Sequence, residues 1–344
     1  MKAMILAAGE GTRLRPLTFQ RPKPLVPIAN RPVIHHVLDN ARRAGIKEVV
    51  INLHWKADEI KAACGDGSRW GIKIHYSVET QLMGTAGGVK KVEHLLKDGP
   101  FIILSGDGIS DIDARKVLKF HSERKALATM VLKAVDYRFE YGVTLTNTRG
   151  RISKFIEKPS WGDVFSNKVN TGIYMFEPGI FRHIPAGKSY DFGKELWPKL
   201  LRQRQPIFGM LFEGYWCDVG NLSEYRRAER DSLDRTVKLQ MPGKEISKGV
   251  WVDEGASIHP KAELKAPCAI GRAVKIAAGA EVGPYTVVGN ESVIAERATL
   301  KNCIIWEQVS VGKNVHLTNC IVGQGGKVTE DITVYEAAVL NVRQ

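Results

Sequence analysis

The first residues that could do chemistry form a glycine-rich loop directly after an apolar N-terminal run. The loop contains Gly9, Gly11 and Arg13, and Lys23 follows between two prolines. Glycines let the backbone approach a ligand closely, and a guanidinium group can bind phosphate through two parallel hydrogen bonds. The spacing lacks the GxxxxGK of a Walker A loop, and Leu14 occupies the third-glycine position of a dinucleotide-binding fingerprint. The loop therefore predicts phosphate binding, with a glycine-rich turn bearing surface arginines as the alternative.

A second candidate is a carboxylate that follows an apolar run. Asp107 comes just after residues 101–104, so it is expected beyond the C-terminal end of a strand, where open α/β sheets bind ligands. Proteins typically hold Mg²⁺ with one or two carboxylates together with substrate phosphates. Asp107 is therefore a candidate magnesium ligand, and the alternative is a turn residue after Gly106. The nearby Asp113 is predicted to cap a helix instead.

The elements that must position these residues alternate along the first part of the chain. Continuous apolar runs separated by helices are typical of a mostly parallel sheet with helices on both faces. Later β-rich stretches predict a mixed or antiparallel extension, so the expected fold is an α/β, Rossmann-like domain with a mixed sheet. The predicted strands are 3–8, 49–53, 101–104, 126–135, 142–146, 151–157 and 169–176, and the predicted helices include 32–44, 86–96 and 223–234.

The C-terminal part repeats an aliphatic residue every six positions. A period of six fits neither a helix nor simple strand alternation, but it is typical of a hexapeptide β-helix, in which each triangular face contributes a short strand. The phase slips after Leu300, which predicts a small loop or bulge near residues 302–312. A boundary near residues 241–243 gives expected domains of 1–240 and 241–344. The repeat consists of Val252, Ile258, Leu264, Ile270, Ile276, Val282, Val288, Ile294 and Leu300.

The glycine-rich loop and the lysine turn together resemble a family signature. GxGTRLxPLT at residues 9–18, followed by PKPLxP at residues 22–27, is similar to the signature of the sugar-1-phosphate nucleotidyltransferases. The likeness is nearest to the mannose-1-phosphate guanylyltransferases, and many family members carry a left-handed β-helix behind the catalytic domain. The resemblance therefore covers essentially the whole chain. Further family elements follow in order as MGTAG at 83–87, SGD at 105–107, FIEKP at 155–159, NTG at 170–172 and YWCDVG at 215–220.

The resemblance implies a Mg²⁺-dependent enzyme that joins a nucleoside monophosphate to a sugar 1-phosphate and releases pyrophosphate. We expect transfer of GMP from GTP to mannose 1-phosphate. The alternatives are uridylyl, thymidylyl or adenylyl transfer to glucose 1-phosphate, and a non-catalytic regulatory subunit that binds nucleotide sugars. A β-helix that transfers acyl groups through His259 or His316 is less favoured, because no extended loop or C-terminal arm accompanies them.

The resemblance also assigns roles to individual residues. The residues implied for catalysis are Arg13, Lys23 and Lys158, and those implied for Mg²⁺ are Asp107 and Asp218. The residues implied for nucleotide binding are Leu6, Ala8, Gly9, Gly11, Thr12, Glu79, Gly84 and Thr85. The residues implied for sugar binding are Gly142, Glu157, Asn170 and Gly172.

Glu79 determines the expected base. It lies five residues before Gly84, where the family places a residue that reads the nucleobase edge. Guanine presents two adjacent donors on its Watson–Crick edge, and an ionised carboxylate only accepts, so Glu79 favours GTP where a glutamine would suit uracil, thymine or adenine. The alternative is a solvated glutamate at a strand end. Leu82 and Met83 differ from the residues usual in the family, and this difference bears on the expected base specificity but not on the reaction class.

Composition and charge exclude several classes of protein. A chain of 344 residues suggests two domains, and its net charge of +13 indicates an anionic partner. Residues 250–344 hold nine Lys and Arg against ten Asp and Glu, so the basic excess lies in the part with the phosphate motifs. Aromatic residues are not interleaved with the basic loop, no signal peptide or membrane-length apolar window is present, and the five cysteines form no CxxC pair. We expect a cytoplasmic homo-oligomer that binds neither nucleic acid nor membrane.

Overall fold

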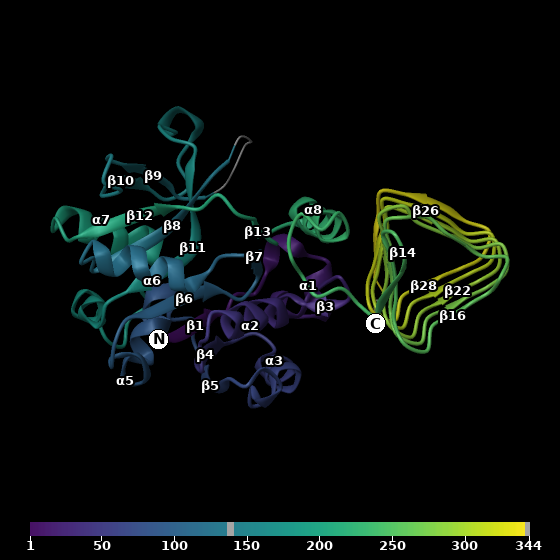
Figure 1. Ribbon diagram of the computed structural model, residues 1–344, viewed down its shortest axis with the longest axis horizontal. Coiled ribbons are helices and arrows are strands. Elements are labelled where there is room, and N and C mark those ends of the chain that lie inside the picture. The colour runs from purple at the N-terminus through teal and green to yellow at the C-terminus, as the bar shows by residue number, and fades with distance from the viewer. Residues whose placement is uncertain (136–140, 341–344) are drawn as a thin grey trace. The chain divides into compact units, whose positions relative to one another are not determined.

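A computed structural model describes residues 1–135 and 141–340, and their elements group into two units (Figure 1). The first unit comprises Met1–Glu10 and Val37–Asp218. The second comprises Gly11–His36 and Val219–Gln344. The signature is therefore divided: residues 9–10 belong to the first unit, and the part from Gly11 onward is grouped with the C-terminal part of the chain.

The first unit is built on a mixed sheet. Its strands are β1 (Lys2–Leu6), β4 (Glu48–Leu53), β5 (Lys73–Val78), β6 (Phe101–Ser105), β8 (Ala128–Ala134), β9 (Val143–Thr146), β10 (Ile152–Ile156), β11 (Lys168–Phe176) and β12 (Ile207–Leu211). Strands β6, β1, β4 and β5 lie side by side in that order and run parallel. Strand β11 is antiparallel to β6 and continues the sheet toward β9 and β10, with β8 and β12 alongside. The mixed sheet predicted from the alternating pattern is confirmed.

Helices connect these strands. They are α2 (Val33–Arg43), α3 (Ala57–Cys64), α4 (Gly84–Lys91), α5 (Glu93–Leu96), α6 (Ala114–Glu123) and α7 (Trp197–Arg202). The single helix predicted over 86–96 is two helices, because the chain leaves helical geometry at Val92. The side chain of Asp113 accepts the N–H of Arg115 and caps α6, as predicted. No helix within residues 1–135 and 141–340 is long and apolar enough to cross a membrane.

The core of the first unit packs aromatic side chains between the sheet and α7. The rings of Phe101 and Phe176 lie 5.8 Å apart, and the ring of Phe176 stacks on Trp197 at 5.6 Å. All three side chains are buried. Continuous burial along β6 explains why this strand appears in the sequence as an unbroken apolar run. Strand β11 is continuously buried only over its last four residues, and its first half alternates between buried and half-buried positions.

The C-terminal strands wind through parallel sheets in turn, as a β-helix does (Figure 1). One sheet holds β15 (Val250–Val252), β18 (Cys268–Ile270), β21 (Thr286–Val288), β24 (Ile304–Ile305), β27 (Ile321–Val322) and β30 (Ala338–Val339), with β14 (Lys244–Ser247) antiparallel at its edge. The second holds β16 (Ser257–Ile258), β19 (Lys275–Ile276), β22 (Val293–Ile294), β25 (Ser310–Val311) and β28 (Lys327–Val328). The third holds β17 (Glu263–Leu264), β20 (Glu281–Val282), β23 (Thr299–Lys301), β26 (His316–Thr318) and β29 (Thr333–Tyr335). The six-residue repeat predicted this solenoid, because from Ile270 to Leu300 its aliphatic residues are buried in the solenoid's own core.

The phase slip after Leu300 has a different cause from the one predicted. Cys268 pairs with Thr286 eighteen residues on, whereas Val287 pairs with Ile304 seventeen residues on, and later coils keep the shorter interval. The predicted small loop near residues 302–312 is wrong, because β24 and β25 occupy this fully described stretch. Each later coil is one residue shorter, and this shifts the frame of the repeat.

The second unit also contains a tight hairpin held by a buried carboxylate. Residues 11–36 form α1 (Leu17–Gln20) and the strands β2 (Pro27–Ile28) and β3 (Arg31–Pro32). The two residues between these strands, Ala29 and Asn30, both have positive φ, as a two-residue type I′ turn requires. The N–H of Ala29 donates to both carboxylate oxygens of Glu229 in α8 (Leu222–Leu233), at 2.8 and 3.1 Å. Glu229 thus fixes the hairpin tip to α8.

Burial of Glu229 predicts a pH dependence of stability. Burial raises its pKa from the ordinary 4.5 to about 7, against the lowering effect of the hydrogen bonds from Ala29 and Ser232. The folded state therefore keeps a proton that the unfolded chain releases, and the free energy of unfolding should fall as pH rises from about 4.5 to 7. At about 1.4 kcal/mol per pKa unit the loss is at most about 3.5 kcal/mol. Urea unfolding of the wild-type protein at pH 5 and pH 8 should show most of this loss. The Glu229→Gln variant should lose less stability between the two pH values. If the variant and the wild-type protein lose the same amount, Glu229 is not the group responsible.

Candidate active site

A pocket of about 390 Å³ opens where β1, β4 and β6 end. β1 lies between β4 and β6, so the strand order changes direction there, and open α/β sheets bind ligands at such a point. The volume lies within the usual range for small-ligand sites. Most of the residues implied by the family resemblance line this pocket, namely Leu6, Ala8, Gly9, Glu79, Gly84, Thr85, Asp107, Glu157, Asn170 and Gly172.

Glu79 is held in the pocket by hydrogen bonds. Its Oε1 accepts from the Nδ2 of Asn52 at 2.8 Å, and its Oε2 accepts the N–H of Met83 at 2.9 Å. The Oδ1 of Asn52 accepts the N–H of Ala7 at 2.9 Å. Asn52 thus connects the end of β1 to Glu79, which is 2 % exposed and is not a solvated strand-end residue. The sequence analysis missed Asn52, although a polar residue inside the apolar run 49–53 was an available signal.

The helix that carries Gly84 approaches residues 188–190 closely. A Cβ on Gly84 would lie 2.6 Å from the carbonyl oxygen of Tyr190, and one on Gly87 would lie 2.8 Å from the carbonyl oxygen of Lys188. The N–H groups of Ala86 and Gly87 both donate to the Tyr190 carbonyl, at 2.9 Å. The glycines of the MGTAG element are therefore needed for this backbone contact.

This contact places Thr85 against an acidic residue that the sequence analysis missed. The hydroxyl of Thr85 donates to Asp191 Oδ2 at 2.9 Å and accepts the N–H of Phe192 at 2.8 Å. Asp191 caps the π-helical turn Phe192–Leu196 and lines the pocket. Burial, and then the negative charge of Asp191, raise the pKa of Glu157. Two carboxyl groups therefore share this side of the pocket.

Asn170 and Gly172 lie in a bulge of β11. The pairing of β11 with β8 shifts between Asn170 and Tyr174, and Gly172 has a φ of +76°. The Oδ1 of Asn170 accepts the N–H of Gly172 at 3.0 Å, and its Nδ2 lies 2.9 Å from the hydroxyl oxygen of Tyr174. The indole N–H of Trp216 donates to the carbonyl oxygen of Thr171 at 3.1 Å. Because bulges redirect side chains, this one explains how the NTG element reaches the pocket.

Two glycines leave room for Glu157. A Cβ on Gly193 would lie 2.5 Å from Glu157 Oε2, and one on Gly142 would lie 2.7 Å from the same oxygen. Gly142 does not line the pocket itself, but its carbonyl accepts the N–H of Asn170 at 2.8 Å. Lys158 is exposed after β10, with a φ of +44°, and is not among the pocket-lining residues. Gly193 is a further residue that the sequence analysis missed.

The two predicted metal ligands lie near each other along a strand pair. Strands β7 (Gly108–Ser110) and β13 (Trp216–Asp218) are antiparallel, and Asp218 pairs with Gly108, the residue after Asp107. Asp107 lines the pocket, and its carboxylate accepts a hydrogen bond from the hydroxyl of Ser105. Within the described residues, no three His, Cys, Asp or Glu side chains cluster as a metal site. A cation here would need further ligands from substrate phosphates, which is how Mg²⁺ is commonly held.

The remaining implied residues, Gly11, Thr12, Arg13 and Lys23, belong to the second unit. Gly11 has a φ of +67°, and a Cβ on it would lie 2.8 Å from the Cβ of Lys23. The hydroxyl of Thr18 donates to the Gly11 carbonyl at 2.8 Å. Lys23 is only 7 % exposed and opens the 3₁₀ turn Lys23–Leu25. The stem of Lys23 therefore packs directly against Gly11.

This packing predicts that Gly11→Ala is harmful. The new methyl group would meet Lys23 at a left-handed backbone position, so either the loop or the lysine must move. We expect kcat/KM for the nucleoside triphosphate to fall by about 10- to 100-fold, as for an ångström-scale misplacement of a substrate-positioning group. Gly162→Ala is the matched control, because it has open space and an ordinary φ. Normal kinetics of Gly11→Ala would show that the spacing between Gly11 and Lys23 is not important for activity.

The fold and pocket define a nucleotide-binding α/β domain combined with a β-helix. The family described as nucleotidyl transferase matches residues 2–235, and the GMPPB C-terminal domain family matches residues 264–343. The chain belongs to the sugar-1-phosphate nucleotidyltransferases, enzymes that act on a nucleoside triphosphate and a sugar 1-phosphate.

Relatives resemble the chain along nearly its whole length. A UTP–glucose-1-phosphate uridylyltransferase of Synechocystis is 35 % identical over 337 residues, which cover 94 % of this chain and 87 % of the relative. The mannose-1-phosphate guanylyltransferase catalytic subunit beta of Danio rerio is 32 % identical over 351 residues, covering 99 % of this chain and 96 % of the relative. The mannose-1-phosphate guanylyltransferase of Mycobacterium tuberculosis is 32 % identical over 305 residues, which cover 88 % of this chain and 82 % of the relative.

A solved structure has the same fold over part of the chain. It is a crystal structure of a Bacillus anthracis protein named as a glucose-1-phosphate thymidylyltransferase, in complex with sucrose. The TM-score is 0.62 and the sequence identity is 24 %, and the match covers 70 % of this chain and 97 % of that one.

Proposed function

We propose that this protein transfers GMP from GTP to mannose 1-phosphate, with Mg²⁺ as cofactor, and releases pyrophosphate. The observation that carries the proposal is the buried Glu79 carboxylate in the wall of the pocket. The amide of Asn52 and the N–H of Met83 orient this carboxylate. A carboxylate can accept both donors of the guanine edge, whereas uracil, thymine and adenine each present a mixed donor and acceptor edge. Relatives named mannose-1-phosphate guanylyltransferases support the same choice.

We assign the sugar to the side of the pocket formed by Glu157, Asn170, Gly172 and Asp191. The carboxylates would accept hydrogen bonds from sugar hydroxyls, and the amide of Asn170 can both donate and accept. The bulge in β11 exposes the backbone of Gly172 without a side chain. These groups suit a hexose, and mannose is proposed from the names of the relatives.

The reaction needs positioning and charge neutralisation more than covalent chemistry. An oxygen of the sugar phosphate attacks the α-phosphorus in line with the departing pyrophosphate. Arg13 would stabilise the leaving pyrophosphate, and Lys23 and Lys158 would bind the reacting phosphates. Asp107 and Asp218 would hold Mg²⁺, which when bound neutralises phosphate charge.

Uridylyl transfer to glucose 1-phosphate is the second candidate. Both oxygens of Glu79 already accept a hydrogen bond from the protein, so the carboxylate also stabilises the pocket wall. The Synechocystis relative at 35 % identity is named a uridylyltransferase. A non-catalytic regulatory subunit remains the alternative from a different class.

A substrate panel tests these possibilities. The protein is incubated with Mg²⁺, each of GTP, UTP, dTTP and ATP, and each of mannose 1-phosphate and glucose 1-phosphate, and pyrophosphate release is measured. The highest kcat/KM is expected for GTP with mannose 1-phosphate. A preference for UTP with glucose 1-phosphate would establish the second candidate, and no turnover with any pair would favour the regulatory subunit.

Glu79→Gln should reduce the preference for GTP. Glutamine keeps the shape and can still accept from Asn52, but it has one acceptor oxygen where glutamate has two. The ratio of kcat/KM for GTP to that for UTP should fall by about 10- to 100-fold. This is the cost of leaving one guanine donor and one polar group of the pocket without a hydrogen-bond partner. Glu123→Gln on the exposed face of α6 is the control. An unchanged ratio would remove Glu79 from base recognition.

A further inference from the structure

We infer that Arg21 is a positioning residue, through which the β-helix holds the segment that carries Lys23. This inference rests on the proposed phosphate-binding role of Lys23. All the contacts that carry it lie within the second unit, between residues 21–30, α8 and the β-helix.

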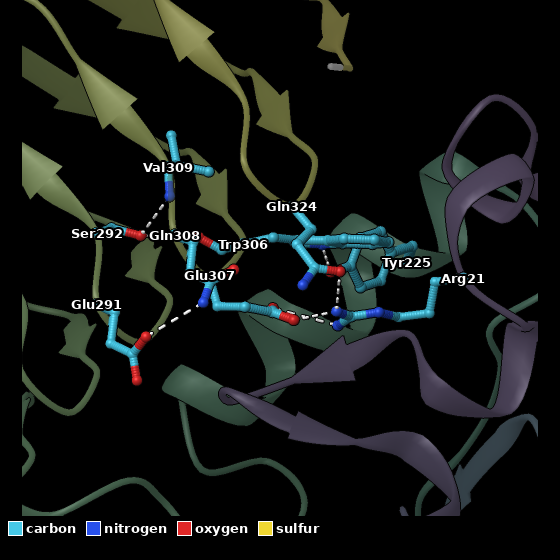
Figure 2. A network of polar contacts seen from close by, with 9 residues as sticks. All are labelled: Arg21, Tyr225, Glu291, Ser292, Trp306, Glu307, Gln308, Val309 and Gln324. Atoms are coloured by element: carbon cyan, nitrogen blue, oxygen red, sulfur yellow. Dashed lines mark hydrogen bonds and ion pairs between the residues drawn. The ribbon is translucent and has the colours of Figure 1, made fainter. Parts of the chain in front are cut away.

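The guanidinium of Arg21 makes a two-pronged contact with Glu307 (Figure 2). Nη1 donates to Glu307 Oε2 at 3.2 Å, and Nη2 donates to Glu307 Oε1 and to Gln324 Oε1, the latter at 2.8 Å. The Arg21 side chain is 14 % exposed and that of Glu307 is 28 % exposed. A bidentate arginine–carboxylate pair that is largely removed from water fixes geometry more strongly than an exposed ion pair does.

An aromatic platform supports the same guanidinium. The centre of the Arg21 guanidinium lies 4.8 Å from the ring centroid of Trp306. The indole N–H of Trp306 donates to the hydroxyl oxygen of Tyr225 at 2.9 Å, and both rings are fully buried (Figure 2). Tyr225 belongs to α8, so the platform cannot move without disturbing the packing of that helix against the β-helix. Cation–π contact and ion pair together set the position of Arg21.

The same segment is tied to the β-helix at a second point. Pro22 restricts the backbone between Arg21 and Lys23, so the anchored residue and the lysine are joined by a stiff connection. At the other end of the segment, Nδ2 of Asn30 donates to the carbonyl oxygen of Val288 at 2.8 Å. Lys23 therefore lies on a stretch of chain that the β-helix holds on both sides.

The cavity beside this contact does not suit an anion. It has a volume of about 360 Å³ and is lined by both Arg21 and Arg272. Each guanidinium already pairs with a carboxylate, because Arg272 Nη2 donates to Glu291 Oε1 at 3.0 Å. The paired charges favour a holding role for Arg21 over a role as a phosphate ligand.

The experiment compares Glu307→Ala, Arg21→Ala and the double variant with Glu291→Ala. Glu291 is the matched control, because its contacts with Arg272 and Gln308 stay within the β-helix. Amide hydrogen exchange is measured for residues 21–31, where Leu25 and Val26 donate to Pro22 and Lys23. Kinetics with GTP and with UTP, and melting temperatures, are measured on the same samples.

Glu307→Ala and Arg21→Ala should each speed exchange of residues 21–31 and raise the KM for the nucleoside triphosphate by about tenfold, in line with misplacement of a substrate-positioning group. The double variant should resemble Arg21→Ala, because Arg21→Ala already removes the pair with Glu307 together with the contacts to Gln324 and Trp306. The Glu291→Ala control should leave exchange and KM unchanged. Unchanged exchange in Glu307→Ala, or effects that add in the double variant, would overturn the inference.

Failure of the proposed function is a separate outcome. If the wild-type protein releases no pyrophosphate with any substrate pair, the proposed function is overturned, while the exchange of residues 21–31 still decides whether Glu307 anchors the segment. Wild-type activity combined with faster exchange and an unchanged KM would show that the anchor exists but does not position Lys23, which would overturn the inference.

Discussion

Asp107→Asn should lower kcat by about 10²- to 10³-fold, the effect commonly seen when one transition-state-stabilising group is removed. Asparagine has the same shape and can still accept the hydrogen bond from Ser105, so the loop should keep its structure. What is lost is a negative charge at the pocket end of β6, next to the position where Asp218 pairs with Gly108. Pyrophosphate release is measured across a Mg²⁺ titration, and higher Mg²⁺ should not restore the rate.

Asp113→Asn is the matched control for this prediction. It removes the same charge six residues further on, at a position whose function is to cap α6, and asparagine is an equally good cap. Its kinetics should match those of the wild-type protein. Substantial activity of Asp107→Asn at saturating Mg²⁺ would show that the metal is bound elsewhere.

The sequence predicted the elements of the site better than the contacts inside it. Asp107 was proposed because it follows the apolar run 101–104, and Glu79 because it lies five residues before Gly84, where the family resemblance places a base-reading residue. Asn52 and Asp191 were missed because their partners are distant in the chain. The hydrogen bond from Asn52 to Glu79 spans 27 positions, and the one from Thr85 to Asp191 spans 106. Such pairs depend on how the strands and loops meet, which local patterns do not specify.

The β-helix shows a different limit. The period of six predicted the solenoid because each short strand repeats the same inward aliphatic position. The slip after Leu300 was interpreted as a local loop, although the paired residues show that every later coil is shorter by one residue. A single loop would shift the repeat once, whereas shorter coils shift it at every turn of the solenoid, so the second slip, between Leu317 and Val322, was an available signal in the sequence.

Arg21 shows why a role can be invisible in the sequence. The residue stands in a basic loop beside Lys23, where both would be interpreted as phosphate ligands. Its partner Glu307 lies 286 positions away in the β-helix. Although the solenoid is nearly neutral overall, its carboxylate at Glu307 pairs with Arg21, which lies between the two signature motifs.

Lys23→Met should lower kcat/KM for the nucleoside triphosphate by about 10²- to 10³-fold while the protein stays folded. Methionine keeps an unbranched stem of similar length, which can still pack against Gly11 in this buried position. The substitution therefore removes the ammonium group and keeps the buried apolar stem. Pyrophosphate release gives kcat/KM, and the melting temperature checks the fold.

Lys23→Arg separates charge from geometry in the same assay. Arginine keeps the positive charge, but its planar fork is larger than an ammonium group, and the side chain at this position is only 7 % exposed. If the lysine acts as a compact point charge on a phosphate, arginine should recover only part of the lost kcat/KM. Lys275→Met, on the exposed face of β19, controls for the loss of one positive charge from the protein. Wild-type kcat/KM in Lys23→Met would exclude Lys23 from phosphate binding, and the bracing by its flanking prolines would then be a structural feature of the turn alone.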